Sequence, residues 1–164
     1  MLAAELHLVG HAGNTIGTIY RRETFMSVFM RIAVAAFSLV VLAANAANEE
    51  AIVKATAAAT SWLALTDAGD GAKSWKAAAS LFQAAVPQAK WEQSLAAARA
   101  PLGPLKGRKV SSATYSRTLP GAPDGEYVVI QFSSQFANKA SAVETVTPMR
   151  EKDGSWKVSG YYIK

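Results

Sequence analysis

The sequence predicts an α+β fold in which N-terminal helices pack on a bent four-stranded antiparallel sheet. Residues 49–100 are rich in alanine and repeat apolar residues at steps of three and four, which is typical of amphipathic helices. Residues 106–164 alternate apolar with polar residues and are divided by glycine and proline, which is typical of strands joined by turns. Because the helices precede the strands without alternating with them, we expect two layers in one domain, residues 47–164.

Residues 26–46 have the pattern of a secretory signal peptide. The pair Met30-Arg31 is followed by an apolar run over residues 32–42 and then by Ala44-Asn45-Ala46, which fits a cleavage motif of small residues. The run is shorter than the roughly 20 apolar residues that span a membrane. We therefore expect cleavage after Ala46 and a periplasmic or secreted product without a stable membrane anchor.

Residues 1–25 do not resemble the usual start of such a leader, because they carry acidic residues and both histidines ahead of Met26. Two interpretations stay open. Either this segment is an extended leader, or the start is mis-assigned and translation begins at Met26 or Met30 rather than at Met1.

The predicted mature domain has a restricted chemical inventory. It contains neither histidine nor cysteine, because both histidines precede it and the chain has no cysteine. This excludes thiol catalysis, Ser-His-Asp triads, disulfides and zinc sites with nitrogen or sulfur ligands, and we expect no metal and no cofactor. Its net charge of +4 favours solubility and a mild attraction to anionic surfaces, without indicating a nucleic-acid partner.

Three helices are expected, over residues 51–65, 72–86 and 88–100. Gly69 suits the left-handed residue that ends a helix, and Asp70 can cap the next one. Pro87 fits the first turn of the third helix. The apolar stripes predicted to be buried are Ile52, Ala55, Ala59, Trp62 and Leu63 in the first helix, and Trp75, Ala78, Ala79, Phe82 and Val86 in the second.

Four strands are expected, over residues 109–118, 126–136, 142–151 and 155–163, with a loop at 119–125 and a tight hairpin at 152–154. Pro148 predicts a bend or bulge in the third strand, since proline cannot donate to a central ladder. In the second strand one face should carry Val128, Ile130, Phe132 and Phe136, and the other Tyr127, Gln131, Ser133 and Gln135. In the fourth, Trp156, Val158 and Tyr162 should share a face.

Several segments of the chain resemble the bacterial domain-of-unknown-function family four thousand and nineteen. They are Trp62-Leu63-x-Leu65-x-Asp67-x-Gly69-Asp70, Ser74-Trp75, Ala100-Pro101-Leu102-Gly103, residues 119–127, residues 142–146, and Gly154-Ser155-Trp156-Lys157-Val158-x-Gly160-Tyr161-Tyr162-Ile163. The resemblance implies an exported protein with a fold similar to the nuclear-transport-factor-2-like, or cystatin-like, cone fold. It implies no activity and no catalytic residues.

Most carboxylates suit helix starts, caps, turns or strand ends, which leaves Asp67, Glu92 and Glu144. Glu144 lies in mid-strand and can face either solvent or an apolar cavity near Tyr127 or Tyr161. In a cavity its pKa would be raised, so that it could act as an acid or base. Asp67 can bond backbone at the helix corner or take part in a site. Asp67, Tyr127, Glu144 and Tyr161 are therefore the candidate ligand-binding residues.

Two other groups of side chains have alternative interpretations. The tryptophans at 62, 75, 91 and 156 are expected in the core, with a sugar or apolar ligand pocket as the alternative. The basic cluster of Arg99, Lys106, Arg108 and Lys109 is expected to be a solvated rim, with contact to an anionic surface as the alternative.

Three functions are compatible with these patterns. We expect a non-enzymatic module that binds a small molecule or a protein. The alternatives are a cone-fold enzyme of the isomerase, dehydratase or hydrolase type, using Glu144 or Asp67 with a tyrosine, and a structural domain that forms a homodimer through its sheet. An enclosed pocket with a desolvated carboxylate favours the enzyme, a closed core the interaction module, and an exposed apolar sheet face the dimer.

Overall fold

The computed structural model describes residues 45–164, and contacts between residues separate a unit of residues 46–164 from residues 1–45. The predicted leader, apart from its last two residues, lies outside the described part. Residues 45–67 are helical and are called the long helix below. It is followed by α2 (Gly71–Ala77), α3 (Ser80–Ala85), α4 (Gln88–Arg99), β1 (Leu105–Ser116), β2 (Tyr127–Phe136), β3 (Lys139–Arg150) and β4 (Trp156–Ile163). The predicted α+β fold class is thus confirmed.

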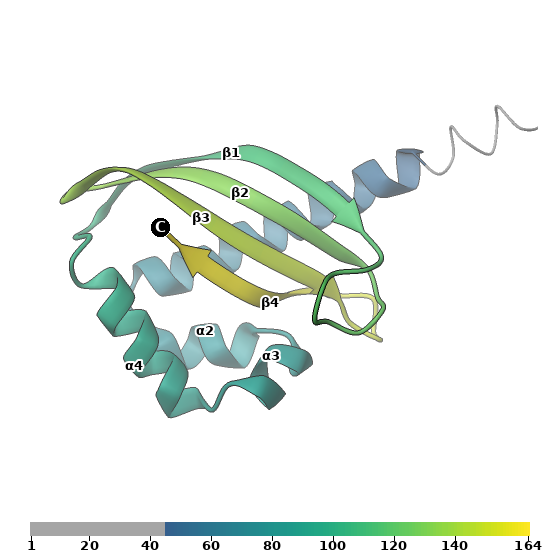
Figure 1. Cartoon of the computed structure of the whole chain (residues 1–164), viewed down its shortest axis with the longest axis horizontal. Coiled ribbons are helices and arrows are strands. Elements are labelled where there is room, and N and C mark those ends of the chain that lie inside the picture. The colour runs from purple at the N-terminus through teal and green to yellow at the C-terminus, as the bar shows by residue number, and fades with distance from the viewer. Residues whose placement is uncertain (1–44) are drawn as a thin grey trace, which may run out of the picture. The chain divides into compact units, whose positions relative to one another are not determined.

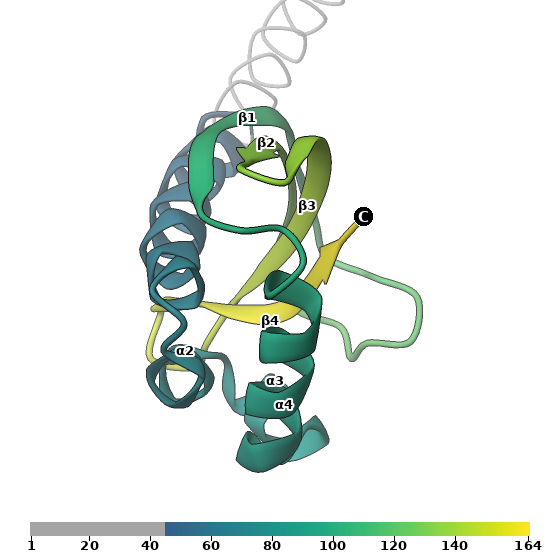
Figure 2. The same ribbon diagram turned by 90° about the vertical axis from the view of Figure 1, so that its left-hand side faces the viewer.

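The four strands form one antiparallel sheet in the order β1-β2-β3-β4. The long helix crosses one face of this sheet, and α2, α3 and α4 lie beside β4 (Figures 1 and 2). We call the face toward the long helix the inner face and the opposite one the outer face. The alternation predicted for β2 is confirmed, because Val128, Ile130, Phe132 and Phe136 are all buried on the inner face.

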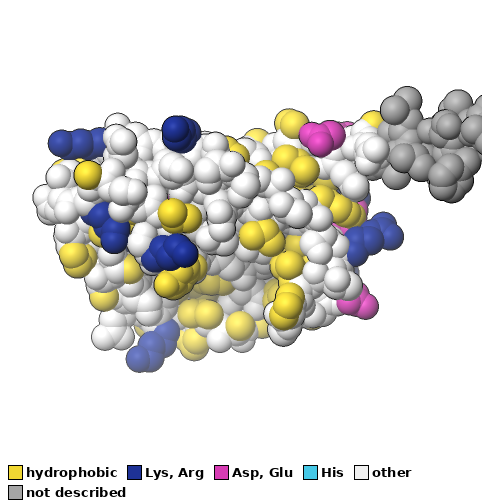
Figure 3. All heavy atoms as spheres, turned by 45° about the horizontal axis from the view of Figure 1, so that its top comes forward, with side chains coloured by type: hydrophobic (Ala, Val, Ile, Leu, Met, Phe, Trp, Pro, Cys, Tyr) yellow, Lys and Arg dark blue, Asp and Glu magenta, His cyan; other side chains and the backbone are white. Residues whose placement is uncertain are grey.

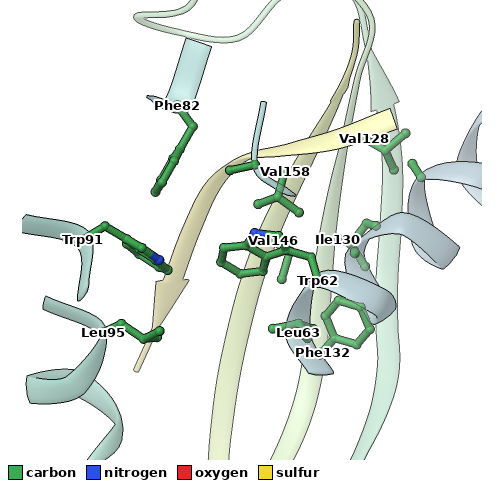
Figure 4. Packing of buried hydrophobic residues seen from close by; sticks show 13 residues of the cluster. Trp62, Leu63, Phe82, Trp91, Leu95, Val128, Ile130, Phe132, Val146 and Val158 are labelled. Carbon is green, nitrogen blue, oxygen red and sulfur yellow. The ribbon is translucent and has the colours of Figure 1, made fainter. Parts of the chain in front are cut away.

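The core lies between the long helix, the three short helices and the inner face (Figure 4). Ala55 and Ala59 have no solvent exposure, and their small side chains let the helix backbone lie close to the sheet. Trp62 packs against Trp91 and Tyr161, with ring centroids 5.6 and 5.4 Å away. Trp62 and Trp91 are core residues, as predicted, while the other two tryptophans are partly buried against the same cluster.

The corner between the long helix and α2 has the predicted chemistry. Gly69 has a positive φ of 73°, and the amides of Gly69 and Asp70 return to the last turn of the helix, with Asp70 N 3.0 Å from Leu65 O. The Asp70 carboxylate caps α2 by accepting from Lys73 N at 3.0 Å. Ser74 joins the helices, because its carbonyl accepts from Trp62 Nε1 at 2.7 Å and its hydroxyl accepts from Trp91 Nε1 at 2.9 Å.

The single helix predicted over residues 72–86 is wrong, because the structure divides it into α2 and α3. Ala78 and Ala79 adopt extended backbone angles, with ψ of 166° and 152°. The amide of Ala79 donates to the carbonyl of Val158 in β4 at 2.8 Å. A tertiary hydrogen bond to the sheet edge therefore replaces helical bonding here, although alanine itself favours a helix.

The predicted orientation of Tyr162 is also wrong. The register between β3 and β4 shifts after Thr147, which pairs with Gly160, whereas Pro148 pairs with Val158. The irregularity near Pro148 was predicted, but its extra residue lies in β4 and reverses the alternation of that strand. Val158 and Tyr161 consequently face the core, and Tyr162 lies on the outer face with 61% of its surface exposed.

Strand boundaries differ from the predicted ones mainly at the starts of β1 and β3, which begin four and three residues earlier than expected. The hairpin at residues 152–154 is confirmed, with a positive φ of 83° at Gly154. None of the helices among residues 45–164 combines the length and apolarity that crossing a membrane requires.

Candidate functional site

Five side chains from five elements meet where α4 and the long helix end against the inner face of the sheet. Two are acidic, two are basic and one is phenolic, so the group has no net charge. We call this group the buried ionic network; it consists of Asp67 at the end of the long helix, Arg99 of α4, Arg108 of β1, Glu144 of β3 and Tyr161 of β4.

Glu144 lies at the centre of the network and has no solvent exposure. One of its oxygens accepts from Ser134 Oγ at 2.6 Å and from Arg108 at 2.6 to 2.8 Å. The other accepts from Tyr161 Oη at 2.7 Å and from Arg99 Nη1 at 3.0 Å. Since a carboxylate offers about four lone-pair positions, these donors leave Glu144 no acceptor site for another molecule.

Asp67 forms the outer part of the network. Arg108 approaches it with two nitrogens, Nη1 at 2.7 Å and Nη2 at 3.0 Å, and Arg99 donates to it through Nη2. Each guanidinium therefore bridges Asp67 and Glu144. This replaces the backbone hydrogen bonding that the sequence suggested for Asp67 with a side-chain ion pair.

Both arginines are largely covered, with 13% of the Arg99 and 11% of the Arg108 side chain exposed. The guanidinium of Arg99 also stacks on Phe136, 4.9 Å from the ring centroid. The solvated rim predicted for Arg99 and Arg108 is thus wrong, while Lys106 and Lys109 are exposed as expected.

The network sets the protonation state of Glu144. Burial is the largest influence on the pKa of Glu144 and would raise it. Hydrogen bonds from Ser134 and Tyr161 and the charge of Arg108 together outweigh burial, so the pKa lies below its ordinary value. Of the two surroundings considered for Glu144, solvent and an apolar cavity that would raise its pKa, the structure shows neither, and Glu144 is a carboxylate at neutral pH.

The pKa of Tyr161 is shifted in the opposite direction to that of Glu144. Burial, followed by the adjacent Glu144 charge, raises the pKa of its phenol well above the ordinary value. Tyr161 thus stays protonated and donates to Glu144, while it accepts from Arg99 Nη1 at 3.1 Å. Neither Glu144, held as a carboxylate, nor Tyr161, held as a phenol, therefore exchanges a proton near neutral pH.

Of the four candidate residues, the structure brings together Asp67, Glu144 and Tyr161, and places Tyr127 elsewhere. Tyr127 pairs with Met149 across the sheet, and its hydroxyl donates to Pro123 O at 2.7 Å. The loop between β1 and β2 thereby covers its side chain, which is why this residue is buried on the outer face. Glu92, the third carboxylate left unassigned, accepts from Gln88 within α4 at 2.7 Å.

Sequence reasoning missed Arg99, Arg108 and Ser134 as partners of Glu144. For Ser134 a signal was available, because it has the same parity as Phe132 and Phe136 in β2. A polar residue in the apolar face of a central strand needs a buried partner. What the sequence does not supply is the register that aligns β1, β2 and β3.

A hollow of about 320 Å³ that Arg108 and Ser134 help to line lies beside the network and is open to the surface. Among residues 45–164, every buried side-chain nitrogen and oxygen has a hydrogen-bond partner. The same part of the chain has no cluster of three or more His, Cys, Asp or Glu residues that could hold a metal ion. Another open hollow, of about 370 Å³, lies between the long helix, α2 and β4, beside Trp156.

The fold and this network define a small α+β domain whose buried charges are mutually neutralised. Residues 58–161 match the protein family described as "Protein of unknown function (DUF4019)", and the chain belongs to this family. The match covers all five residues of the network. No curated protein and no solved structure matches the chain.

Proposed function

We propose that the protein is a non-enzymatic binding module that contacts its partner through the outer face of its sheet. The proposal includes export of the domain, which the signal-peptide pattern of residues 26–46 supports. It also includes the cone fold, which the order of helices followed by a bent antiparallel sheet supports.

The observation that carries the proposal is the neutralisation of the carboxylates in the interior. Glu144 and Asp67 are the residues that the enzyme alternative needs, and two arginines neutralise both. Acid or base catalysis requires a group whose pKa lies near the working pH. The lowered pKa of Glu144 and the raised pKa of Tyr161 move these groups away from it.

The outer face is the surface left for recognition. The helices lie against the inner face and β4, and no helix among residues 45–164 covers the outer face (Figures 1 and 2). Its central positions carry polar and small apolar side chains such as Gln131, Thr145 and Val143, with Tyr162 standing out from them. Aromatic residues of this kind are enriched at binding surfaces.

Two exposed residues provide a matched test. A photo-crosslinking amino acid would replace Tyr162 on the outer face, or Val53 on the long helix, whose exposures are 61% and 67%. In cells that produce the chain, we expect adducts from position 162 and none from position 53. Equal labelling at the two positions would contradict the proposal, and adducts of twice the mass of the chain would favour the homodimer.

The enzyme alternative has its own test, because it requires a carboxyl group that titrates near neutral pH. In protein labelled with ¹³C at the glutamate carboxyls, Glu144 should remain ionised at every pH above its ordinary value of 4.5. The Glu144→Gln variant assigns the resonance. A titration midpoint of Glu144 between pH 6 and 8 would contradict the proposal of a non-enzymatic module, since it would place a proton-exchanging acid inside the fold.

A further inference from the structure

The end of the sheet that holds the start of β1 and the β2–β3 hairpin has an unbalanced positive charge. Lys106 and Lys109 lie in β1, Lys139 begins β3 and Lys164 follows β4. All four are exposed, and none forms an ion pair with a residue in the described part of the chain. Arg99 and Arg108, which lie nearby, are balanced by Asp67 and Glu144, so the lysines carry the excess.

Two of these lysines belong to one row across all four strands of the outer face. Lys109 pairs with Ser133, Ser133 pairs with Val143, and Val143 exchanges two backbone hydrogen bonds with Lys164. Their inner-face neighbours are Arg108, Ser134 and Glu144, so the parity of each strand places the row on the outer face. With strands about 4.8 Å apart, Lys109 and Lys164 lie roughly 14 Å from each other.

Polar side chains and a hollow lie between and beside these charges. A hollow of about 320 Å³ opens at this end of the sheet, and its lining includes Lys109, Ser133, Gln135 and Ser141. Hydroxyl and amide groups donate and accept hydrogen bonds without adding charge. Tyr162, one row from Lys164, adds an exposed ring.

The charge on this part of the surface is of one sign. Figure 3 shows most of the Lys and Arg side chains of this view on the half of the molecule away from the residues drawn in grey, whereas the acidic side chains gather at the other end beside one further basic group. The carboxylates of the buried ionic network are already paired with Arg99 and Arg108. Such a surface attracts anions and lowers the cost of binding them.

We propose that this end of the outer face binds an anionic polysaccharide, a ligand class that rests on the proposed function of the outer face as a binding surface. Lysines meet the carboxylate, sulfate or phosphate groups of the chain, the serine and glutamine side chains bond sugar hydroxyls, and Tyr162 packs on a sugar ring. Repeated negative charges along a polymer match lysines roughly 14 Å apart better than one small anion does.

The same features argue against two other anionic partners. Within the described residues, the large apolar side chains that are well exposed are Val53, Val110 and Tyr162, and they do not form the continuous apolar patch that inserts into a membrane. Single-stranded nucleic acid is held by several aromatic rings that stack successive bases. Tyr162 alone does not provide such a platform.

The test uses alginate, a carboxylated polysaccharide, with uncharged dextran as its control. The variant Lys109→Gln/Lys164→Gln removes both charges of the row, and Lys76→Gln/Lys90→Gln removes two exposed lysines from the helices. In titrations at low salt, we expect the wild type and the helix variant to bind alginate alike, and the row variant to bind about tenfold more weakly. The affinity of the wild type should fall with added salt, because the contacts are ionic and exposed.

The outcomes separate this inference from the proposed function. Equal weakening by both variants, or binding to dextran as strong as to alginate, would overturn it. Binding to vesicles of phosphatidylglycerol and phosphatidylcholine without binding to alginate would overturn it in favour of a membrane. Protein adducts at position 162 without alginate binding would leave the outer face as the binding surface and refute only the polysaccharide.

Discussion

Replacing Glu144 by glutamine should destabilise the fold far more than the small change in shape suggests. Ser134 and Tyr161 donate to different oxygens of the carboxylate, so glutamine keeps an acceptor for only one of them. The substitution also removes the charge that faces Arg99 and Arg108, which lie 3.0 and 2.6 Å from the carboxylate. Asp67 alone then balances two covered guanidinium groups. Removing one partner of a buried ion pair typically costs about 3 to 5 kcal/mol of unfolding free energy, and we expect this range here.

Urea titration followed by tryptophan fluorescence measures this free energy, because Trp62 and Trp91 pack within the same core as Tyr161. The matched control is Glu126→Gln, which breaks a surface pair with Arg150 at 2.9 Å and should cost less than about 1 kcal/mol. If Glu144→Gln costs no more than the control, the buried ionic network does not stabilise the fold, and our reasoning on Glu144 fails.

Three more predictions concern the same protein. The fold lowers the pKa of Glu144, so the stability that this carboxylate contributes is present above pH 4.5 and is lost as the pH falls through the folded pKa. The free energy of unfolding should therefore fall less steeply with acid in Glu144→Gln than in the wild type. Parallel curves of unfolding free energy against pH would contradict this. Tyr161→Phe should cost about 1 to 2 kcal/mol in urea titrations and leave the absorbance change of tyrosine ionisation near pH 10 unaltered, because the wild-type phenol is not expected to ionise there; a smaller absorbance change in the variant would argue against the raised pKa. Gly69→Ala should cost about 1 to 2 kcal/mol because of its positive φ, whereas Gly107→Ala, where an added Cβ has no neighbour within 4 Å, should be near neutral; similar melting temperatures for the two would refute this reason.

Local patterns in the sequence predict most of the fold, because they depend on neighbours along the chain. The stop at Gly69, the cap at Asp70 and the alternation of β2 each follow from one residue or from a period of two. The two errors in the fold have tertiary causes. Ala79 donates its amide to the carbonyl of Val158 in β4, which ends the helix there. The extra residue of β4 opposite the Thr147–Pro148 step places Tyr162 on the outer face.

The candidate site was predictable only in part, for a related reason. Composition and parity identify Asp67 and Glu144 as carboxylates without an evident local role. Their partners Arg99 and Arg108 lie 32 to 45 positions away in the sequence, and only the docking of α4 and β1 brings them together. Charge alone therefore predicted solvated side chains for Arg99 and Arg108, which the fold buries and neutralises.

The way in which Ser74 joins the helices bears on the order of folding. Its bonds to Trp62 and Trp91 link positions only 12 and 17 apart, whereas the ion pairs of the network link positions 32 to 45 apart. Short loops close at lower entropic cost, so the helical layer is expected to form in the folding transition state and the network after it. Ser74→Ala should accordingly slow folding, while Glu144→Gln should mainly accelerate unfolding. The two variants would then show that the contacts of Ser74 form before those of Glu144.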